Sequence, residues 1–138
     1  MLDSYRELID ELLGAPSAIR GMMTDSTATP ETMLLVAEIR DRDVVVLERL
    51  NTIMRATDPR FGVIAPGVPE IPESLEALLE QADTARGDLV SLLMNLTLKD
   101  WERTASHDVD GEISLSEEVE RHVDFDEAHL ARLRAALG

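Results

Sequence analysis

The sequence contains no cysteine, which excludes disulfide bonds, zinc–thiolate sites and a cysteine nucleophile. Aromatic residues make up only 3% of the chain, although hydrophobic residues make up 44%. Leucine, valine, isoleucine, alanine and methionine must therefore fill the core, and this composition suits packed helices better than a β-sandwich. No strand pattern is evident, and no apolar run approaches the ~20 residues that span a membrane.

Basic residues are also scarce, with 13 lysines and arginines against 28 aspartates and glutamates. The formal net charge of the 138-residue chain is −15, whereas nucleic acids and anionic membranes attract basic surfaces. The N-terminal stretch MLDSYRELIDELL lacks the basic start and apolar run of a signal peptide. We expect one cytoplasmic domain over residues 1–138 that binds neither nucleic acid nor membrane.

Apolar residues spaced by three and four predict a first amphipathic helix from Leu2 to Leu12. The stretch GAPSAIRGMMTDSTAT, residues 14–29, contains glycine and proline and is predicted to break this helix. A short helical turn is expected around residues 17–23.

A second helix is predicted from residue 30, with Thr29 as N-cap and Pro30 in the first helical position. Asp43 is expected at the edge of its inner face, where a polar group needs a partner. The predicted inner stripe is Met33, Ala37, Arg40, Val44, Leu47, Asn51 and Met54.

Residues 58–72 hold four prolines and two glycines, so they cannot be helical. Fifteen residues can extend to ~50 Å, which is more than the ~40 Å length of the second helix. The segment can therefore cross the whole molecule and allow a third helix to run parallel to the second. The predicted inner stripe of that third helix is Leu75, Leu78, Ala82, Ala85, Leu89, Leu92 and Leu96.

A further turn is expected after residue 96, with Trp101 packed over the end of the bundle. The last helix begins at SLSE, where Ser114 and Glu117 form a predicted capping box. Its inner stripe is Leu115, Val119, Val123, Asp126, Leu130, Leu133 and Leu137. We predict an all-α fold, a four-helix bundle with a long crossover between helices two and three.

The stretch RHVDFDEAHL, residues 121–130, contains two histidines on the last helix. Asp126 falls within the apolar stripe, so we expect it to face the interior and to need a partner. A buried hydrogen bond between Asp126 and His129 that orients two helices is favoured over metal ligation. His122 is expected to be a boundary residue with no special role.

DWERTASHDVDGEISLSEEVERHVDFDEAHLARL, residues 100–133, resembles the closing pattern of the DinB-like (DinB/YfiT) proteins. The shared pattern is a Trp–Arg turn, a histidine before a glycine, a leucine-led helix and a His-Asp-x-x-His run. The resemblance covers most of the chain and is clearest over residues 30–50 and 98–137. It implies a four-helix bundle that holds a divalent metal, often nickel or zinc, with three histidines.

Carried over by position, the resemblance keeps one of the three histidines as His129. Phe125 stands where the second is expected and acts as a plug, and Glu38 stands in place of the third. Loss of the metal is therefore favoured, and no cofactor is expected. The alternative is a rewired nickel or zinc site from Glu38, Asp126 and His129, although Asp126 points ~100° round the helix from Phe125.

A second metal signal lies in SHDVDGEISLSE, residues 106–117, which resembles a calcium loop of the EF-hand type. Asp108, Asp110 and Glu117 occupy ligand positions of such a loop. However, Ser106 stands where an aspartate is expected, no second loop pairs with this one, and Glu117 already caps a helix. A polar loop with a glycine turn is the favoured interpretation.

Three functional hypotheses remain open. In the first, the chain is a binding or scaffold protein that lacks the metal of the DinB-like proteins and forms a homodimer through helix faces. In the second, it is a metal-dependent thiol S-transferase or isomerase, as the resemblance implies, with the rewired site. In the third, it binds calcium through residues 106–117. The sequence does not identify a substrate or small-molecule ligand.

Overall fold

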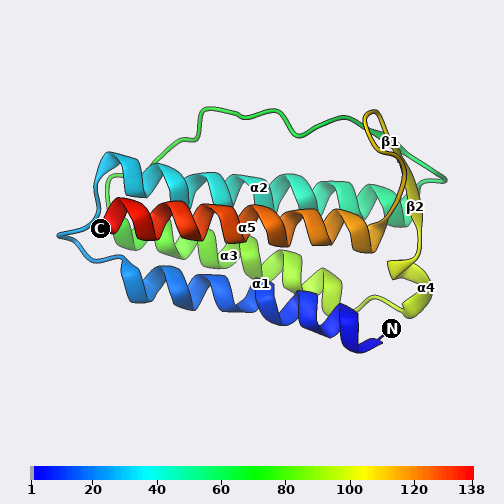
Figure 1. The fold of residues 1–138 in the computed structure, drawn as a ribbon, viewed down its shortest axis with the longest axis horizontal. Helices are drawn as coiled ribbons and strands as arrows, with labels where there is room; N and C mark the ends of the chain where they lie inside the picture. Colours follow the sequence, from blue (N-terminus) through cyan, green and yellow to red (C-terminus); the bar gives the residue numbers. More distant parts are fainter. Residues whose placement is uncertain (1) are drawn as a thin grey trace.

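The computed structural model describes residues 2–138, except for the side chain of Leu2. Four long helices pack side by side: α1 (Leu2–Met22), α2 (Pro30–Arg55), α3 (Leu75–Met94) and α5 (Leu115–Leu137). Figure 1 shows that α1 and α5 run in one direction and α2 and α3 in the other. The predicted four-helix bundle is therefore confirmed, whereas the expected contribution of the Leu2 side chain lies outside the described part.

The predicted crossover is also present. Residues 56–74 leave the end of α2, pass along the whole bundle and return to the start of α3 (Figure 1). The caps form as the sequence predicts, because Thr29 and Ser114 each accept a hydrogen bond from the backbone of their helix. Within residues 2–138, no helix is both long and apolar enough to cross a bilayer.

The predicted break in the first helix is wrong, because α1 continues through Pro16 to Met22. A proline inside a helix leaves the carbonyl four residues earlier without its backbone donor. That carbonyl belongs to Leu12, and Arg86 Nη1 on α3 donates to it at 2.7 Å. Ala15 and Ile19, on either side of the proline, are buried, so burial holds the second half of α1 in line.

The structure corrects the expectation that no strands are present. β1 (Arg60–Phe61) pairs in parallel with β2 (Thr104–His107), and β2 pairs antiparallel with β3 (Gly111–Ser114). Strands of two to four residues are too short to show a clear alternation in the sequence. The predicted extra turn is confirmed as α4 (Leu98–Trp101), and the ring of Trp101 stacks on Tyr5 with centroids 4.6 Å apart.

The inner face of α2 differs from the predicted stripe. Val44 is 47% exposed, whereas Val46 and Asp43 are buried. Apolar residues occur on several faces of α2, so the spacing alone did not select the correct one, and the prediction placed Asp43 only at the edge of the inner face. The observed inner face consists of Thr32, Leu35, Val36, Ala37, Ile39, Asp43, Val46, Leu50 and Ile53.

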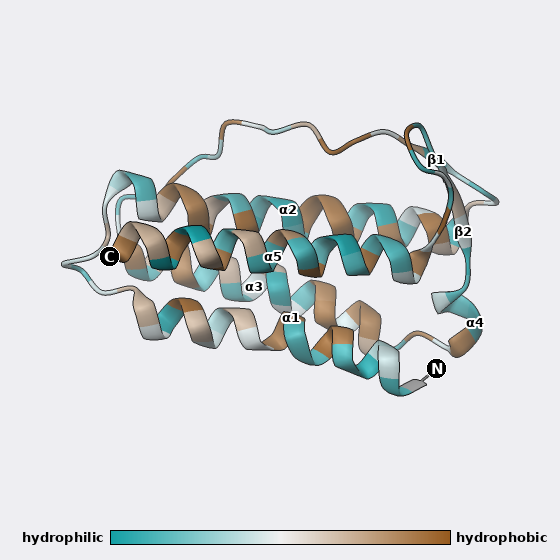
Figure 2. Cartoon of the chain, viewed as in Figure 1, coloured by the Kyte–Doolittle hydropathy of each residue, from teal (hydrophilic) through white to brown (hydrophobic). Residues whose placement is uncertain are grey.

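The core divides into two apolar clusters along the bundle axis. One lies near the sheet and includes Leu50 and Leu89, and the other lies at the opposite end and includes Val36 and Leu78. Figure 2 shows hydrophilic and hydrophobic stretches alternating along the helices. Between the two clusters, each long helix contributes at least one buried polar group, described below.

Candidate functional site

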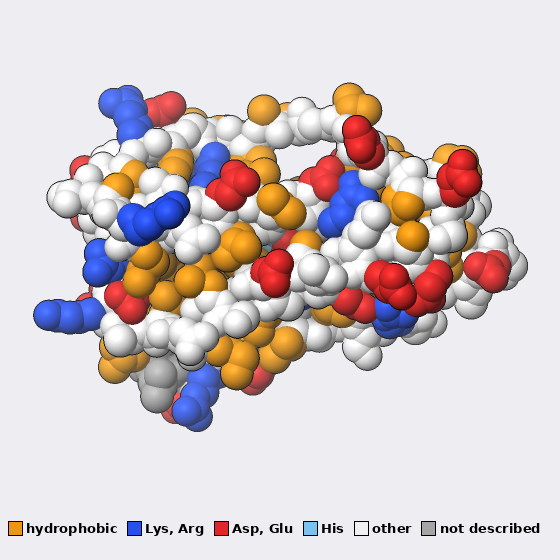
Figure 3. Space-filling model, turned by 180° about the vertical axis from the view of Figure 1, so that it is seen from behind, with side chains coloured by type: hydrophobic (Ala, Val, Ile, Leu, Met, Phe, Trp, Pro, Cys, Tyr) orange, Lys and Arg blue, Asp and Glu red, His pale blue; other side chains and the backbone are white. Residues whose placement is uncertain are grey.

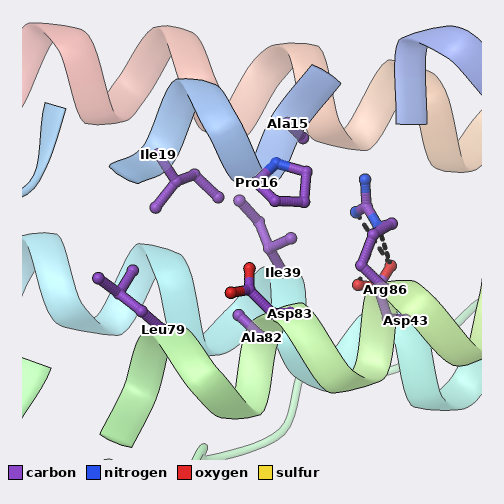
Figure 4. Close-up of a pocket in the computed structure, with 9 residues that line it drawn as sticks. All are labelled: Ala15, Pro16, Ile19, Ile39, Asp43, Leu79, Ala82, Asp83 and Arg86. Atoms are coloured by element: carbon purple, nitrogen blue, oxygen red, sulfur yellow. Dashed lines mark hydrogen bonds and ion pairs between the residues drawn. The ribbon is translucent and has the colours of Figure 1, made fainter. Parts of the chain in front are cut away.

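Arg86 of α3 lies at the centre of this buried polar layer. Its guanidinium binds Asp43 of α2, with Nε 3.1 and 3.0 Å from the two carboxylate oxygens. It also binds both oxygens of Asp126 on α5, at 2.6 and 2.8 Å. With the bond to Leu12 O on α1, one side chain connects all four helices (Figure 4 shows the Arg86–Asp43 contact beside Pro16).

Burial alone would lower the pKa of Arg86, but the hydrogen bond with Asp126 and the charges of Asp43 and Asp126 raise it above its ordinary value. Arg86 is therefore permanently charged. Both Asp43 and Asp126 share this one guanidinium as their ion-pair partner. The prediction that Asp126 is buried is confirmed, but its partner is Arg86 and not His129.

The expectation that His122 is an unimportant boundary residue is wrong. His122 is fully buried, and its Nε2 lies 2.6 Å from Asp43 Oδ1. Arg42 Nε, which always carries hydrogen, donates to His122 Nδ1 at 3.2 Å. Nδ1 is therefore the acceptor and Nε2 the donor, so Arg42 and Asp43 together select one neutral tautomer of His122.

Arg42 extends the polar layer to the surface of the bundle. Its guanidinium carbon lies 4.5 Å from the centre of the Phe125 ring, a cation–π distance. On the other side, Phe125 stacks on His129 with centroids 3.9 Å apart. Phe125 is thus held between an arginine and a histidine.

His129 is 5% exposed, and neither ring nitrogen has a hydrogen-bond partner within residues 2–138. Its Nε2 lies 3.5 Å from Glu38 Oε1, which is too far for a good hydrogen bond. Burial lowers the pKa of His129, and the nearby Glu38 offsets only part of this effect. The structure thus brings Glu38, Phe125 and His129 together, as their correspondence to the DinB-like ligand positions predicts.

A cleft of about 350 Å³ opens beside Phe125, between α2 and the crossover. From α2 it is lined by Glu38, Asp41, Arg42 and Val45, and from the crossover by residues 64–67 and Pro69. Figure 3, seen from behind, shows open space between the crossover and the bundle.

Two arginines of α2 hold the roof of the cleft in place. Arg49 Nη2 donates to the carbonyl of Gly62 at 2.6 Å, and Arg40 Nη2 donates to the carbonyl of Glu70 at 2.7 Å. Arg49 also lies 3.3 Å from a carboxylate oxygen of the buried Glu118. The segment between these two anchors spans the cleft without a further backbone hydrogen bond to α2 in the described residues.

This architecture matches a known one. The structure aligns with the one described as "YfiT from Bacillus subtilis is a probable metal-dependent hydrolase with an unusual four-helix bundle topology", with a TM-score of 0.79 and 19% sequence identity. The alignment covers 99% of this chain and 87% of that chain. The chain has the YfiT fold. No protein-family model matches the sequence, and no curated protein matches it either.

The YfiT fold confirms the DinB/YfiT-type architecture expected from residues 100–133, and it raises the question of a metal. The side chains do not fit a catalytic divalent ion, which usually has three protein ligands and one open position. Glu38 and His129 could supply two donors, but the third place holds Phe125, and both oxygens of Asp126 bind Arg86. Within residues 2–138, no three His, Cys, Asp or Glu side chains are grouped to hold a metal.

The stretch that resembles a calcium loop folds as the β2–β3 hairpin. Asp108 Oδ1 accepts from Arg60 Nε at 2.7 Å, Asp110 pairs with Arg121, and Glu117 accepts from the backbone N–H of Ser114. The three carboxylates are therefore bound to three different partners. Gly111, with a φ of 73°, makes the turn.

Sequence reasoning missed Arg86, Arg42 and the role of His122. A signal for Arg86 was available, because it stands four residues after Ala82 and three before Leu89 on the predicted stripe of α3. A charged residue at such a position, with Asp43 and Asp126 on the inner faces of two other helices, indicates a buried ion pair.

Proposed function

We propose that this chain is a DinB/YfiT-type bundle protein that binds a small molecule without a resident metal ion. The observation that supports the proposal is the stack of Arg42, Phe125 and His129. An aromatic ring stands where the resemblance expects a ligand, and a guanidinium lies against that ring. A positive charge there opposes a divalent cation, whereas the adjoining cleft offers space for an organic ligand.

A metal-dependent activity, such as thiol transfer or isomerisation, is the second candidate. It is supported by His129, whose buried nitrogens lack partners beside Glu38. YfiT is described as a probable metal-dependent hydrolase, which adds a hydrolytic version of the same candidate. In this alternative, Glu38 and His129 would bind the ion, and a further ligand would have to come from outside the residues described above.

Metal analysis distinguishes the two candidates. Untagged protein is purified without chelators, dialysed against trace nickel, zinc and calcium, and its metal content is measured. We expect less than about 0.1 equivalent of each metal per chain. One equivalent of nickel or zinc that is lost in His129→Ala would contradict the proposal and favour the metal-dependent candidate, and one equivalent of calcium that is lost in Glu117→Ala would identify residues 106–117 instead.

A restored site provides the positive control. The double variant Glu38→His/Phe125→His places three imidazoles where the resemblance expects them, so it should bind about one zinc ion per chain. The matched control Glu31→His/Asp124→His adds two histidines at exposed positions on the same helices and should bind none stoichiometrically. Zinc binding by the first variant alone would show that Phe125 and Glu38 are what prevent binding in the natural sequence.

The homodimer expected from the sequence remains a proposal. Light scattering after size-exclusion chromatography measures the mass in solution. A mass of about 15.3 kDa would contradict the homodimer.

A further inference from the structure

We infer that the cleft beneath the crossover takes a small amphipathic monocarboxylate, with Arg42 as the group that binds its carboxylate. The inference rests on the proposed function, because it names the ligand class for the same cleft. The inference depends on three features: the unused hydrogen-bond donors of Arg42, the apolar walls of the cleft and the charged side chains at its rim.

Arg42 has no acidic partner, although acids outnumber bases by more than two to one. The other arginines of the interior are paired, Arg86 with two aspartates and Arg49 with Glu118. No carboxylate oxygen of residues 2–138 lies within ion-pair distance of Arg42. Glu38, one turn earlier on α2, has the spacing of a helical ion pair, but its carboxylate lies toward His129 instead.

The orientation of Arg42 is fixed by two contacts that leave its terminal nitrogens available. Nε donates to His122 Nδ1, and one face of the guanidinium covers the Phe125 ring. Neither terminal nitrogen donates a hydrogen bond within the described residues, and Arg42 lines the cleft. A guanidinium with two free N–H groups on one edge matches the two oxygens of a carboxylate.

The guanidinium of Arg42 is partly desolvated. Desolvation lowers the pKa of Arg42, and the field of Glu118 offsets this only in part. A bound carboxylate would supply hydrogen-bond acceptors in place of the water molecules that burial excludes from the guanidinium. The attraction between the two charges is also stronger in a partly desolvated site than in bulk water. A neutral ligand offers no such compensation.

The remaining cleft surface suits the hydrocarbon part of such a ligand. Its walls include Val45, Ile64, Pro66, Pro69 and the Phe125 ring. A volume of about 350 Å³ is at the small end of the range for small-molecule sites. The ligand is therefore a compact molecule with one apolar group.

The rim limits the ligand to one negative charge. Asp41 is neutralised by Arg40 Nε at 2.8 Å. Glu38 has no arginine or lysine partner in the described residues, and it lines the same cleft. A second carboxylate or a phosphate on the ligand would be repelled by Glu38.

Three probes of equal shape test the charge preference: 4-phenylbutyrate, 4-phenylbutanamide and 4-phenylbutylamine. Each is titrated into ¹⁵N-labelled protein, and amide chemical shifts give the Kd and the location. We expect 4-phenylbutyrate to shift residues of the cleft and to bind at least about tenfold more tightly than the amide, since hydrogen bonds to charged groups contribute about this much. The amine should bind most weakly.

Arg42→Gln should abolish the preference for the carboxylate over the amide. Arg55→Gln is the matched control, because Arg55 lies on the same helix, is exposed and does not line the cleft. Arg55→Gln should retain the preference of the natural sequence. Thermal unfolding of both variants verifies that they are folded, and Arg42→Lys, which keeps the charge without the planar fork, replaces Arg42→Gln if that variant unfolds.

Equal binding of the acid and the amide in the cleft would overturn the inference but keep the proposed function, because the cleft would still bind an organic ligand without metal. Tighter binding of the amine would also overturn it, since the rim carboxylates would then dominate. An absence of shifts for all three probes would overturn it too. Failure of the proposed function has a different signature, a stoichiometric metal in the natural protein.

Discussion

Removal of the Arg86 side chain is the most informative perturbation of this bundle. In Arg86→Met, the methionine retains much of the length of the arginine but cannot donate hydrogen bonds. Asp43 and Asp126 would then be buried without a counter-charge, at 1% and 3% exposure. The carbonyl of Leu12 would also lose its Arg86 donor, and no backbone N–H could replace it because residue 16 is a proline.

Breaking a buried ion pair by removal of one partner costs about 3–5 kcal/mol. An unsatisfied buried carbonyl adds about 1 kcal/mol or more. Since a domain of this kind has a total stability of about 5–15 kcal/mol, Arg86→Met should lose roughly a quarter or more of it. The exposed pair of Arg103 with Asp100 supplies the control, and Arg103→Met should cost less than about 1 kcal/mol.

Urea unfolding followed by far-ultraviolet circular dichroism measures both variants at pH 7. The triple variant Asp43→Asn/Arg86→Met/Asp126→Asn removes both stranded charges and should be more stable than Arg86→Met alone. A loss below about 1 kcal/mol for Arg86→Met at pH 7 would refute the central role assigned to this arginine.

Two further predictions concern α1 and α5. Pro16→Ala should raise the free energy of unfolding by much less than the ~3 kcal/mol that a proline costs in an ordinary helix interior, because Arg86 already donates to the Leu12 carbonyl. An increase near ~3 kcal/mol in urea unfolding would contradict this prediction. Burial lowers the pKa of His129 below its usual 6.5, so the folded state resists protonation and stability should fall as the pH drops below about 6.5 and through the lowered value. His129→Gln removes this contribution, and urea midpoints at pH 7.5 and 5.5 should differ less in that variant than in the natural protein; an unchanged difference would assign the pH dependence to other groups.

The parts of the fold that depend on local sequence were predictable. The spacing of leucines in α3, the Thr29 and Ser114 caps and the reach of the proline-rich crossover each follow from a short stretch of chain. The position of Trp101 over the bundle end follows in the same way. These features need no knowledge of a distant partner.

The features that sequence reasoning missed depend on contacts between distant residues. Pro16 breaks a helix by the local rule, and the donor that compensates for it comes from Arg86, which follows the Leu12 acceptor by 74 positions in the sequence. The inner face of α2 was misplaced because apolar residues occur on several of its faces, and the contacts with Arg86 and His122 that favour burial of Asp43 come from two other helices. The site was predictable only as a set of positions, Glu38, Phe125 and His129, because no local pattern identifies Arg42 as its cation.

The buried layer and the cleft are one continuous system. Arg86 and His122 both bind Asp43, and Arg42 reaches His122 from the cleft side. Asp43 holds the Nε2 proton of His122, which leaves Nδ1 as the acceptor that Arg42 needs. The terminal nitrogens of Arg42 are the proposed ligand-binding donors, and its Nε is held by His122, which Asp43 holds in turn. The core layer thus fixes the direction in which the cleft presents its positive charge.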